Sequence, residues 1–207
     1  MNQKNSLGLN NCFLDLDDPF ELFKSWMKEA EKNEINDPNA FSLATADNTG
    51  KPDVRMILLK GLNSKRFIFY TNLNSPKSHN FNENPEGAMC FHWKSLLRQI
   101  RISGTVNQLD DSQVDSYFNT RSYGSKIGAW ASNQSSAMKE RAELLKRIED
   151  FKKKYSDEKK VPRPPYWSGY SLSPSIFEFW LSVKDRNHER LRYKNTAHAW
   201  KKEILYP

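Results

Sequence analysis

Apolar and polar residues alternate along much of this chain after residue 40, which is the period of a pleated strand. The segments with this period are residues 41–46, 54–60, 67–71, 88–93, 98–109, 167–181 and 200–205. Asn48, Thr49 and Gly50 form a turn signal, and residues 61–65 form another. Successive strands joined by short turns predict an antiparallel sheet or barrel rather than a doubly wound fold.

A helix is predicted to begin at Asp18, because this residue is a good N-cap and Pro19 suits the first helical position. Its apolar stripe for core packing comprises Phe20, Phe23, Met27 and Ala30. Residues 1–17 are rich in Asn and lack periodicity, so we expect a flexible N-terminal arm there. Residues 18–207 are then expected to form one domain.

Three further helices are predicted between the strands. Ser75 and Pro76 open a short one through about residue 82, Asp110 begins one that reaches about Arg121, and the third covers residues 139–155. The third is expected to bury Ala142, Leu145, Ile148 and Phe151. The predicted fold class is therefore mainly β with flanking helices (α+β).

Composition narrows the class of protein. The 207 residues include 12 Phe, 6 Trp and 8 Tyr, enough to fill a sizeable core. No apolar run could cross a bilayer and no signal-peptide core begins the chain, so we expect a cytoplasmic protein without a membrane partner. Cys12 and Cys90 are expected to be free thiols, and no Cys/His spacing indicates a metal site.

The net charge of +7 favours an anionic partner, whether nucleic acid, anionic lipid or a phosphorylated small molecule. The densest basic runs, residues 152–154 and 159–160, lie at a predicted helix end, where solvated lysines are favourable. The arginines mostly fall singly within patterned segments, which suits discrete phosphate contacts. No nucleic-acid motif is present, so a basic nucleic-acid-binding module is only a remote alternative.

Residues 176–190 combine a strand pattern with a cluster of cations. Arg186, His188 and Arg190 are two residues apart, so an extended chain would point them to one face. Two guanidiniums beside an imidazole suit an anionic ligand that also exchanges a proton. The alternative is a solvated loop after an edge strand, but the aromatic run before the cluster favours a site.

Residues 176–190 resemble the C-terminal signature of the pyridoxamine 5'-phosphate oxidases, the FMN enzymes that make pyridoxal 5'-phosphate. The matching residues are Glu178, Phe179, Trp180, Arg186, His188 and Arg190. Two positions depart from the signature, since Asn187 replaces an aliphatic residue and Ser182 replaces the usual Gln, His or Gly. In relatives an N-terminal arm supplies an arginine, whereas this chain has none before Arg55 and Lys4 is the only cation of its arm.

The resemblance continues through blocks in the right order from about Asp18, and it implies a set of FMN-binding residues. These are Arg55, Met56, Ile57, Leu58, Leu59, Lys60, Tyr70, Thr71, Lys77, Gln99, Gln134, Ser135, Trp180 and Arg190. From the residues alone, Arg55 and Lys60 would as readily reach solvent at their strand ends. A helix N-terminus with Lys77 beside it is suited to a phosphate, although Pro76 replaces a basic residue of the family.

The implied substrate residues are Lys60, Tyr117, Arg121, Ser125, Arg186 and His188. Tyr117 and Arg121 are four apart in a predicted helix and so share a face, which is a weak signal by itself. The resemblance assigns Tyr117, Arg121 and Ser125 to the substrate phosphate. Arg186 and His188 are the implied catalytic residues.

As a whole, the resemblance implies an FMN-binding split β-barrel of antiparallel Greek-key type, forming a homodimer with FMN at the interface. The implied reaction oxidises pyridoxamine or pyridoxine 5'-phosphate to pyridoxal 5'-phosphate, with oxygen as acceptor and hydrogen peroxide as product. The alternative is another split-barrel protein, a flavin reductase or a flavin-binding protein without this activity. The matches that argue against it serve the substrate and not the flavin, and they are Tyr117, Arg121, Ser125, Arg186 and His188.

Overall fold

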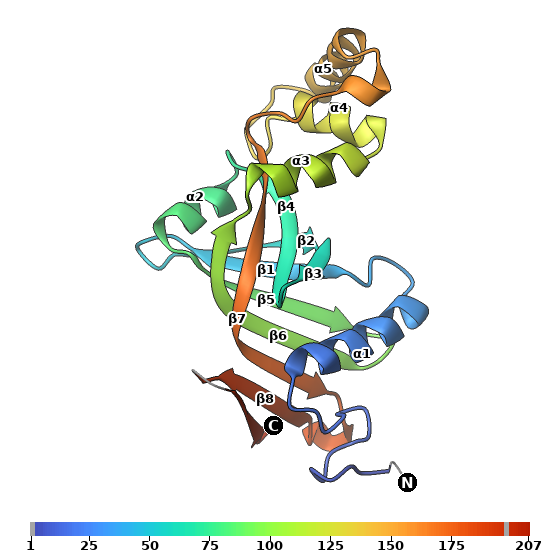
Figure 1. The fold of residues 1–207 in the computed structure, drawn as a ribbon, viewed down its shortest axis with the longest axis vertical. Coiled ribbons are helices and arrows are strands. Elements are labelled where there is room, and N and C mark those ends of the chain that lie inside the picture. The colour runs from blue at the N-terminus through green and yellow to red at the C-terminus, as the bar shows by residue number, and fades with distance from the viewer. Residues whose placement is uncertain (1–2, 197–198) are drawn as a thin grey trace.

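In the computed structural model, which describes residues 3–196 and 199–207, nine strands form one antiparallel sheet (Figure 1). The strands are β1 (Ala40–Ala46), β2 (Pro52–Leu58), β3 (Gly61–Asn63), β4 (Arg66–Asn72), β5 (Glu86–Trp93), β6 (Arg98–Gln108), β7 (Trp167–Leu181), β8 (Glu189–Asn195) and β9 (Trp200–Leu205). Their order is β2-β1-β5-β6-β7-β4-β3, while β8 pairs with β7 and β9 with β8. The predicted mainly β architecture with flanking helices is confirmed.

The long strand β7 connects the two ends of the molecule. Its first half pairs with β4, from Asn72 opposite Trp167 to Phe67 opposite Leu172, and its second half pairs with β8. Strand β6 follows it along most of its length, with an irregularity at Gly104. A Cβ at Gly104 would lie 2.0 Å from the Ser173 carbonyl oxygen, so this close approach requires glycine.

Helix α1 (Pro19–Asn33) covers the core, as its apolar stripe predicts. The Asp18 carboxylate accepts the backbone N–H of Phe20 at 3.0 Å, which caps the helix. Phe20 and Phe23 are buried and pack against Phe67, with ring centroids 5.8 and 4.9 Å away. The same cluster reaches β7, since Phe20 also meets Phe177 edge-on at 5.0 Å.

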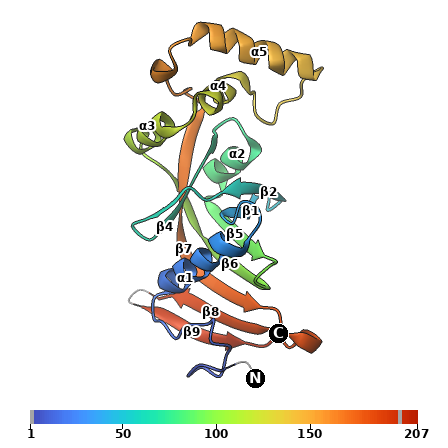
Figure 2. The same cartoon turned by 90° about the vertical axis from the view of Figure 1, so that its right-hand side faces the viewer.

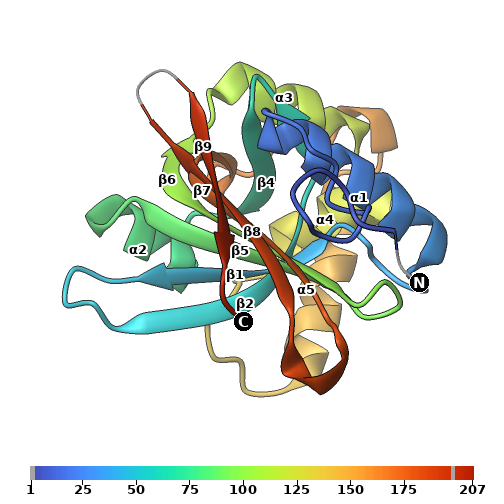
Figure 3. The same cartoon turned by 90° about the horizontal axis from the view of Figure 1, so that it is seen from below.

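The segment before α1 differs from the expected flexible arm. Within residues 3–17, Leu9 and Phe13 are buried, and the Trp26 indole donates to the Cys12 carbonyl oxygen at 2.7 Å. Lys4 forms an ion pair with Glu189 at the start of β8. Seen from below, this segment lies beside α1 (Figure 3). Two apolar anchors in a polar segment are enough to dock it, while residues 1–2 of the expected arm lie outside the described residues.

Three helices gather at the opposite end: α3 (Asp111–Thr120), α4 (Tyr123–Ala131) and α5 (Arg141–Lys154) (Figure 2). Helix α4 is absent from the sequence prediction. Its first turn is capped by the Ser122 hydroxyl, which accepts the Ser125 N–H.

The predicted burial along α5 is wrong for this chain. Ala142 and Leu145 are exposed, Ile148 and Phe151 are only half-buried, and the helix packs mainly on α4. An apolar stripe predicts which face of a helix is apolar, but it does not predict that the same chain packs against that face.

No helix in the described ranges is long and apolar enough to cross a membrane. Within the same ranges, no three His, Cys, Asp or Glu side chains are grouped as they would be to hold a metal ion.

Candidate active site

Three adjoining cavities of about 290, 370 and 370 Å³ lie where β2, β4 and helices α3 and α4 meet α2 (Pro76–Glu83). Ile57 lines all three, and Tyr70, Arg121 and Trp167 line two, so the cavities form one continuous depression. The predicted site residues that line it are Arg55, Met56, Ile57, Leu58, Lys60, Tyr70, Thr71, Lys77, Tyr117, Arg121, Ser125, Gln134 and Ser135. Segments far apart in sequence therefore converge here.

Strand β2 forms one wall of the depression and is an edge strand, paired with β1 alone in the described sheet. Val54 and Met56 are 64% and 62% exposed, whereas Arg55 turns inward. The Arg55 guanidinium donates to the Leu43 carbonyl oxygen at 3.0 Å and pairs with Asp53. Instead of pointing into solvent, this cation is held at the cavity wall.

Lys77 is a buried cation in the first turn of α2. Its Nζ donates to the hydroxyls of Ser75 at 2.9 Å and Thr71 at 3.3 Å, and no carboxylate of the described chain pairs with it. Burial, with a further contribution from Arg55, lowers the pKa of Lys77 to about 8. Ser75 occupies the N-cap position, but its hydroxyl donates to the Asn72 carbonyl oxygen, so the predicted side-chain cap does not form.

Arg121, which ends α3, is a second cation without an acidic partner among the described residues. Its guanidinium carbon lies 4.7 Å from the Trp167 ring centroid and 5.6 Å from that of Phe118. Burial lowers the pKa of Arg121, and its Nη1 is buried without a hydrogen-bond partner. The cavities that Arg121 lines hold no carboxylate of the described residues, so an anionic ligand there would supply its counter-charge.

Three flat side chains line the cavity beside Arg121. The rings of Tyr70 and Tyr117 stack with centroids 3.9 Å apart and planes 3° apart, and Trp167 lies parallel at 5.2 Å from Tyr70. Burial raises the pKa of both tyrosines, so their phenols stay neutral near pH 7. The sequence prediction missed Trp167 as a site residue, because a tryptophan beginning a strand is more often part of the core.

Two predicted residues, Gln134 and Ser135, come from the loop after α4, and both line the same cavity as Arg55 and Lys77. Ser135 has a left-handed backbone (φ 68°). Leu59, in contrast, lies in the core at 9% exposure, and its carbonyl oxygen accepts the Asn39 side-chain amide. Its side chain and carbonyl oxygen are thus used within the fold.

Five predicted residues lie elsewhere, at the far end of β7 (Figure 1). They are Gln99, Trp180, Arg186, His188 and Arg190. Thirteen residues separate Trp167, at the cavity, from Trp180, so at about 3.3 Å per residue the distance along β7 is on the order of 40 Å. Within one chain, these residues do not line the cavity.

The distal group has its own geometry, and the predicted extended arrangement of its cations is wrong. Asp185 and Arg186 have positive φ of 56° and 59° in a short 3₁₀ turn, so Arg186 does not alternate with His188 along a strand. The His188 ring lies 4.6 Å from that of Trp180, and its Nδ1 accepts the Val183 N–H at 3.2 Å. The turn therefore removes the shared face that an extended chain would have given Arg186 and His188.

Arg190, the one member of the cluster inside β8, is held by a carboxylate. Its Nε and Nη2 donate to Glu178 Oε1 at 3.0 and 2.8 Å, and Arg101 approaches the other Glu178 oxygen at 3.5 Å. Glu178 is buried, and the guanidinium is therefore fixed in orientation.

Comparison with known families assigns two parts of the chain. Residues 27–155 match the family model described as pyridoxamine 5'-phosphate oxidase. Residues 167–207 match the model described as the pyridoxine 5'-phosphate oxidase C-terminal dimerisation region. The cavity falls largely in the first part, and the distal group, apart from Gln99, falls in the second.

Individual relatives agree with this assignment. The chain is 55% identical over 208 residues to the pyridoxine/pyridoxamine 5'-phosphate oxidase of Pelagibacter ubique (strain HTCC1062), with 100% of both chains covered. It is 45% identical to that of Rhizobium etli (strain ATCC 51251 / DSM 11541 / JCM 21823 / NBRC 15573 / CFN 42), covering 94% of this chain and 95% of the relative.

Solved structures share the fold. PhzG from Burkholderia lata 383, in complex with tetrahydrophenazine-1-carboxylic acid, superposes with a TM-score of 0.88 at 29% identity, covering 99% of this chain and 100% of that one. A pyridoxamine 5'-phosphate oxidase-related, FMN binding protein from Nostoc punctiforme PCC 73102 shares the fold at 16% identity (TM-score 0.74; 92% and 98% covered). The predicted split-barrel fold is thus confirmed, and the chain belongs to the pyridoxamine 5'-phosphate oxidase family.

Proposed function

We propose that this protein is an FMN-dependent oxidase that converts pyridoxamine 5'-phosphate and pyridoxine 5'-phosphate to pyridoxal 5'-phosphate, with oxygen as acceptor and hydrogen peroxide as product. The observation that carries the proposal is Arg121, a half-buried guanidinium without an acidic partner among the described residues, in a cavity with neutral aromatic walls. A phosphorylated aromatic substrate matches that combination of charge and flat surface.

The cavity residues fit FMN as the cofactor. Lys77, buried with only hydroxyl partners, and Arg55 at the cavity wall would hold its phosphate. The other residues that would hold it from this chain are Met56, Ile57, Leu58, Lys60, Tyr70, Thr71, Gln134 and Ser135. When bound, FMN supplies the redox chemistry, accepting a hydride equivalent from the substrate and passing electrons to oxygen.

The substrate phosphate would be held by Arg121, Lys60, Tyr117 and Ser125, all of which line the depression. Arg121 supplies a positive charge at the cavity wall, and the neutral Tyr117 phenol supplies a donor without repelling the phosphate. Binding at this end would fix the position of the ring.

The rest of the site would come from a second copy of the chain in a homodimer. In this proposal the partner's distal group meets the cavity, with Arg186 orienting the substrate, His188 managing a proton, and Trp180, Arg190 and Gln99 contacting the flavin. Three observations support it: the separation on the order of 40 Å along β7, the exposed apolar edge of β2, and the match of residues 167–207 to a dimerisation region.

The test is an anaerobic absorption spectrum of the protein reconstituted with FMN, before and after addition of pyridoxine 5'-phosphate. We expect the flavin band to bleach as pyridoxal 5'-phosphate forms, then to recover with air as an equal amount of hydrogen peroxide forms. A flavin that stays oxidised would contradict the proposal and favour another split-barrel flavoprotein.

Tetrahydrophenazine-1-carboxylic acid, the ligand of the PhzG structure, is a matched control because it lacks a phosphate group. We expect it to reduce the flavin poorly here, since Arg121 would remain unpaired. Bleaching by this compound but not by pyridoxine 5'-phosphate would assign the protein to a different substrate class.

A further inference from the structure

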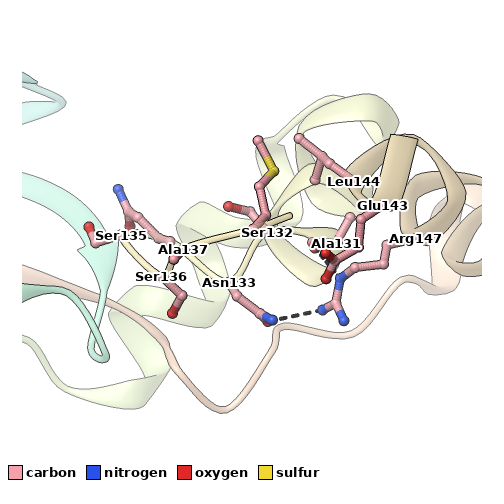
Figure 4. A pocket seen from close by; sticks show the side chains of 11 residues that line it. Ala131, Ser132, Asn133, Ser135, Ser136, Ala137, Glu143, Leu144 and Arg147 are labelled. Atoms are coloured by element: carbon pink, nitrogen blue, oxygen red, sulfur yellow. Dashed lines mark hydrogen bonds between the residues drawn. The ribbon is translucent and has the colours of Figure 1, made fainter. Parts of the chain in front are cut away.

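The loop of residues 132–137 carries two of the proposed cofactor contacts, yet its own backbone is weakly tied. Gln134 and Ser135 line the cofactor cavity on one side of the loop. They also line a separate cavity of about 240 Å³ on the side of α5 (Figure 4), so cavities lie on both sides of the loop. Its described backbone hydrogen bonds are those of Ser132 to Gly128 and Ser136 to Asn133, both 3.0 Å.

Arg147 of α5 supplies the missing support (Figure 4). Its Nε donates to the Ala131 carbonyl oxygen at 2.6 Å, and its Nη2 donates to Asn133 Oδ1 at 3.0 Å. The planar guanidinium therefore bridges the end of α4 and the first turn of the loop. A cation at the carboxyl end of a helix is also favoured by the helix dipole.

The side chain of Arg147 is itself restrained. The guanidinium lies 5.9 Å from the Phe151 ring centroid, and Phe151 packs against Trp130 of α4 at 5.6 Å. Because α5 buries no side chain, burial of the helix does not fix the loop. The hydrogen bonds of Arg147 are the described link from α5 to the loop backbone and to Asn133.

We propose that Arg147 is a positioning residue for the flavin. Through Ala131 and Asn133 it holds the loop so that Gln134 and Ser135 face Arg55 and Lys77 across the cofactor cavity. Arg147 touches neither the cofactor nor the substrate cavity. The inference rests on the flavin site of the proposed function.

The test titrates FMN into the apoprotein and follows quenching of flavin fluorescence. In Arg147→Met, which keeps an unbranched stem but loses the guanidinium, we expect FMN to bind about tenfold more weakly. Arg147→Lys should lie between this variant and the wild type. Lys146→Ala is the matched control, because this neighbouring cation is exposed and should leave the affinity unchanged.

Coupling separates positioning from a general loss of structure. If Arg147 acts through the loop, adding Gln134→Ala to Arg147→Met should weaken FMN binding little beyond the stronger single effect. Asn133→Ala removes the acceptor without altering α5 and should weaken binding in the same direction. Amide hydrogen exchange of residues 132–137 in the apoprotein should accelerate in Arg147→Met while the β7 amides keep their protection.

Binding of FMN by Arg147→Met within twofold of the wild type would overturn the inference, as would losses that multiply fully with Gln134→Ala. A wild-type apoprotein that takes up no FMN would instead overturn the proposed function. In that case the exchange measurement still tests whether Arg147 holds the loop.

Discussion

Two cations at the cavity lack the acidic partner that cations at the far end of the molecule have, although Arg55 at the cavity pairs with Asp53. At the cavity end, the buried Lys77 and the half-buried Arg121 have no carboxylate partner among the described residues. At the other end, Arg190, Arg192 and Lys202 each meet an acid, namely Glu178, Glu203 and Asp15.

This difference in pairing separates cations that are available to bind a ligand from cations that stabilise the fold. A buried cation without an acid destabilises the fold unless something else supplies the negative charge, so the cavity end is arranged for an anion that arrives from solution. A cation already paired is neutralised and oriented by the chain itself. Variants at the two ends should accordingly affect different quantities, ligand binding at the first and stability at the second.

The largest effect should come from testing whether the two ends meet across a dimer. Arg121→Glu and Arg186→Glu should each be nearly inactive. The first would repel the substrate phosphate, and the second reverses the charge of the side chain that is proposed to orient the substrate. Co-expressed in equal amounts, they should recover about a quarter of wild-type activity, because half of the dimers would carry one intact site. No recovery would mean that each chain builds its own site.

The matched control for that experiment places both substitutions on one chain and co-expresses it with the wild type. A shared site predicts about a quarter of the activity, from wild-type dimers alone, whereas a site within one chain predicts about half. Specific activity of the purified mixture measures both.

Arg121→Met is expected to raise KM for pyridoxine 5'-phosphate about 10- to 100-fold, the loss of a hydrogen bond to a charged group. Its thermal midpoint should stay equal or rise, since the variant removes a buried cation with an unsatisfied Nη1. A clear fall in the midpoint at unchanged KM would make Arg121 a structural residue.

Glu178→Gln should lower stability, in contrast to Arg121→Met. It keeps the shape of the buried side chain but leaves Arg190 without its counter-charge, so the free energy of unfolding should fall by about 1–3 kcal/mol. Urea denaturation of the apoprotein measures this, with Arg121→Met as the comparison. Equal stability of wild type and Glu178→Gln would remove the contrast between the two ends.

The smallest effect concerns the pH dependence of FMN binding. Lys77 loses its proton near pH 8 in the folded apoprotein, and a bound phosphate would favour the protonated form, so affinity should fall about tenfold from pH 7 to pH 9. Lys77→Met should bind FMN more weakly with a flatter profile. A wild-type profile as flat as that of the variant would exclude Lys77 from the phosphate site.

The same group has a signed effect on the stability of the apoprotein. Between the folded pKa of about 8 and the ordinary value of 10.5, the unfolded chain binds more protons than the folded one. Lys77 therefore makes the apoprotein more stable as pH rises through this window, and the trend should disappear in Lys77→Met.

Much of the fold follows from local patterns, because alternation and turn residues act over a few neighbours. The segment 67–71 and the helix after Asp18 lie close to their predicted places. Helix α4 escapes prediction because Gly124 and Gly128 are poor helix formers and its capping depends on Ser122. The burial along α5 is mispredicted because an apolar stripe does not identify which element, if any, packs against it.

The site divides in the same way. Family motifs predict Tyr117, Arg121 and Gln134, but they do not predict Trp167 as the surface on which Arg121 stacks. The turn at Asp185 is also missed, since spacing between cations carries no information about a positive φ. Which distant segments share one cavity is a property of the tertiary fold and has no local signal.

The long sequence separation between β4 and its partner β7 has a consequence for synthesis of the protein. Strand β4 ends at Asn72, and β7, its partner, begins at Trp167, so about 95 residues must be made before the two can pair. At about 5–20 residues per second the nascent chain waits roughly 5–20 s with β4 unpaired on the side that β7 will occupy. During synthesis, this unpaired strand edge could pair with another chain, and a chaperone that binds it would prevent aggregation.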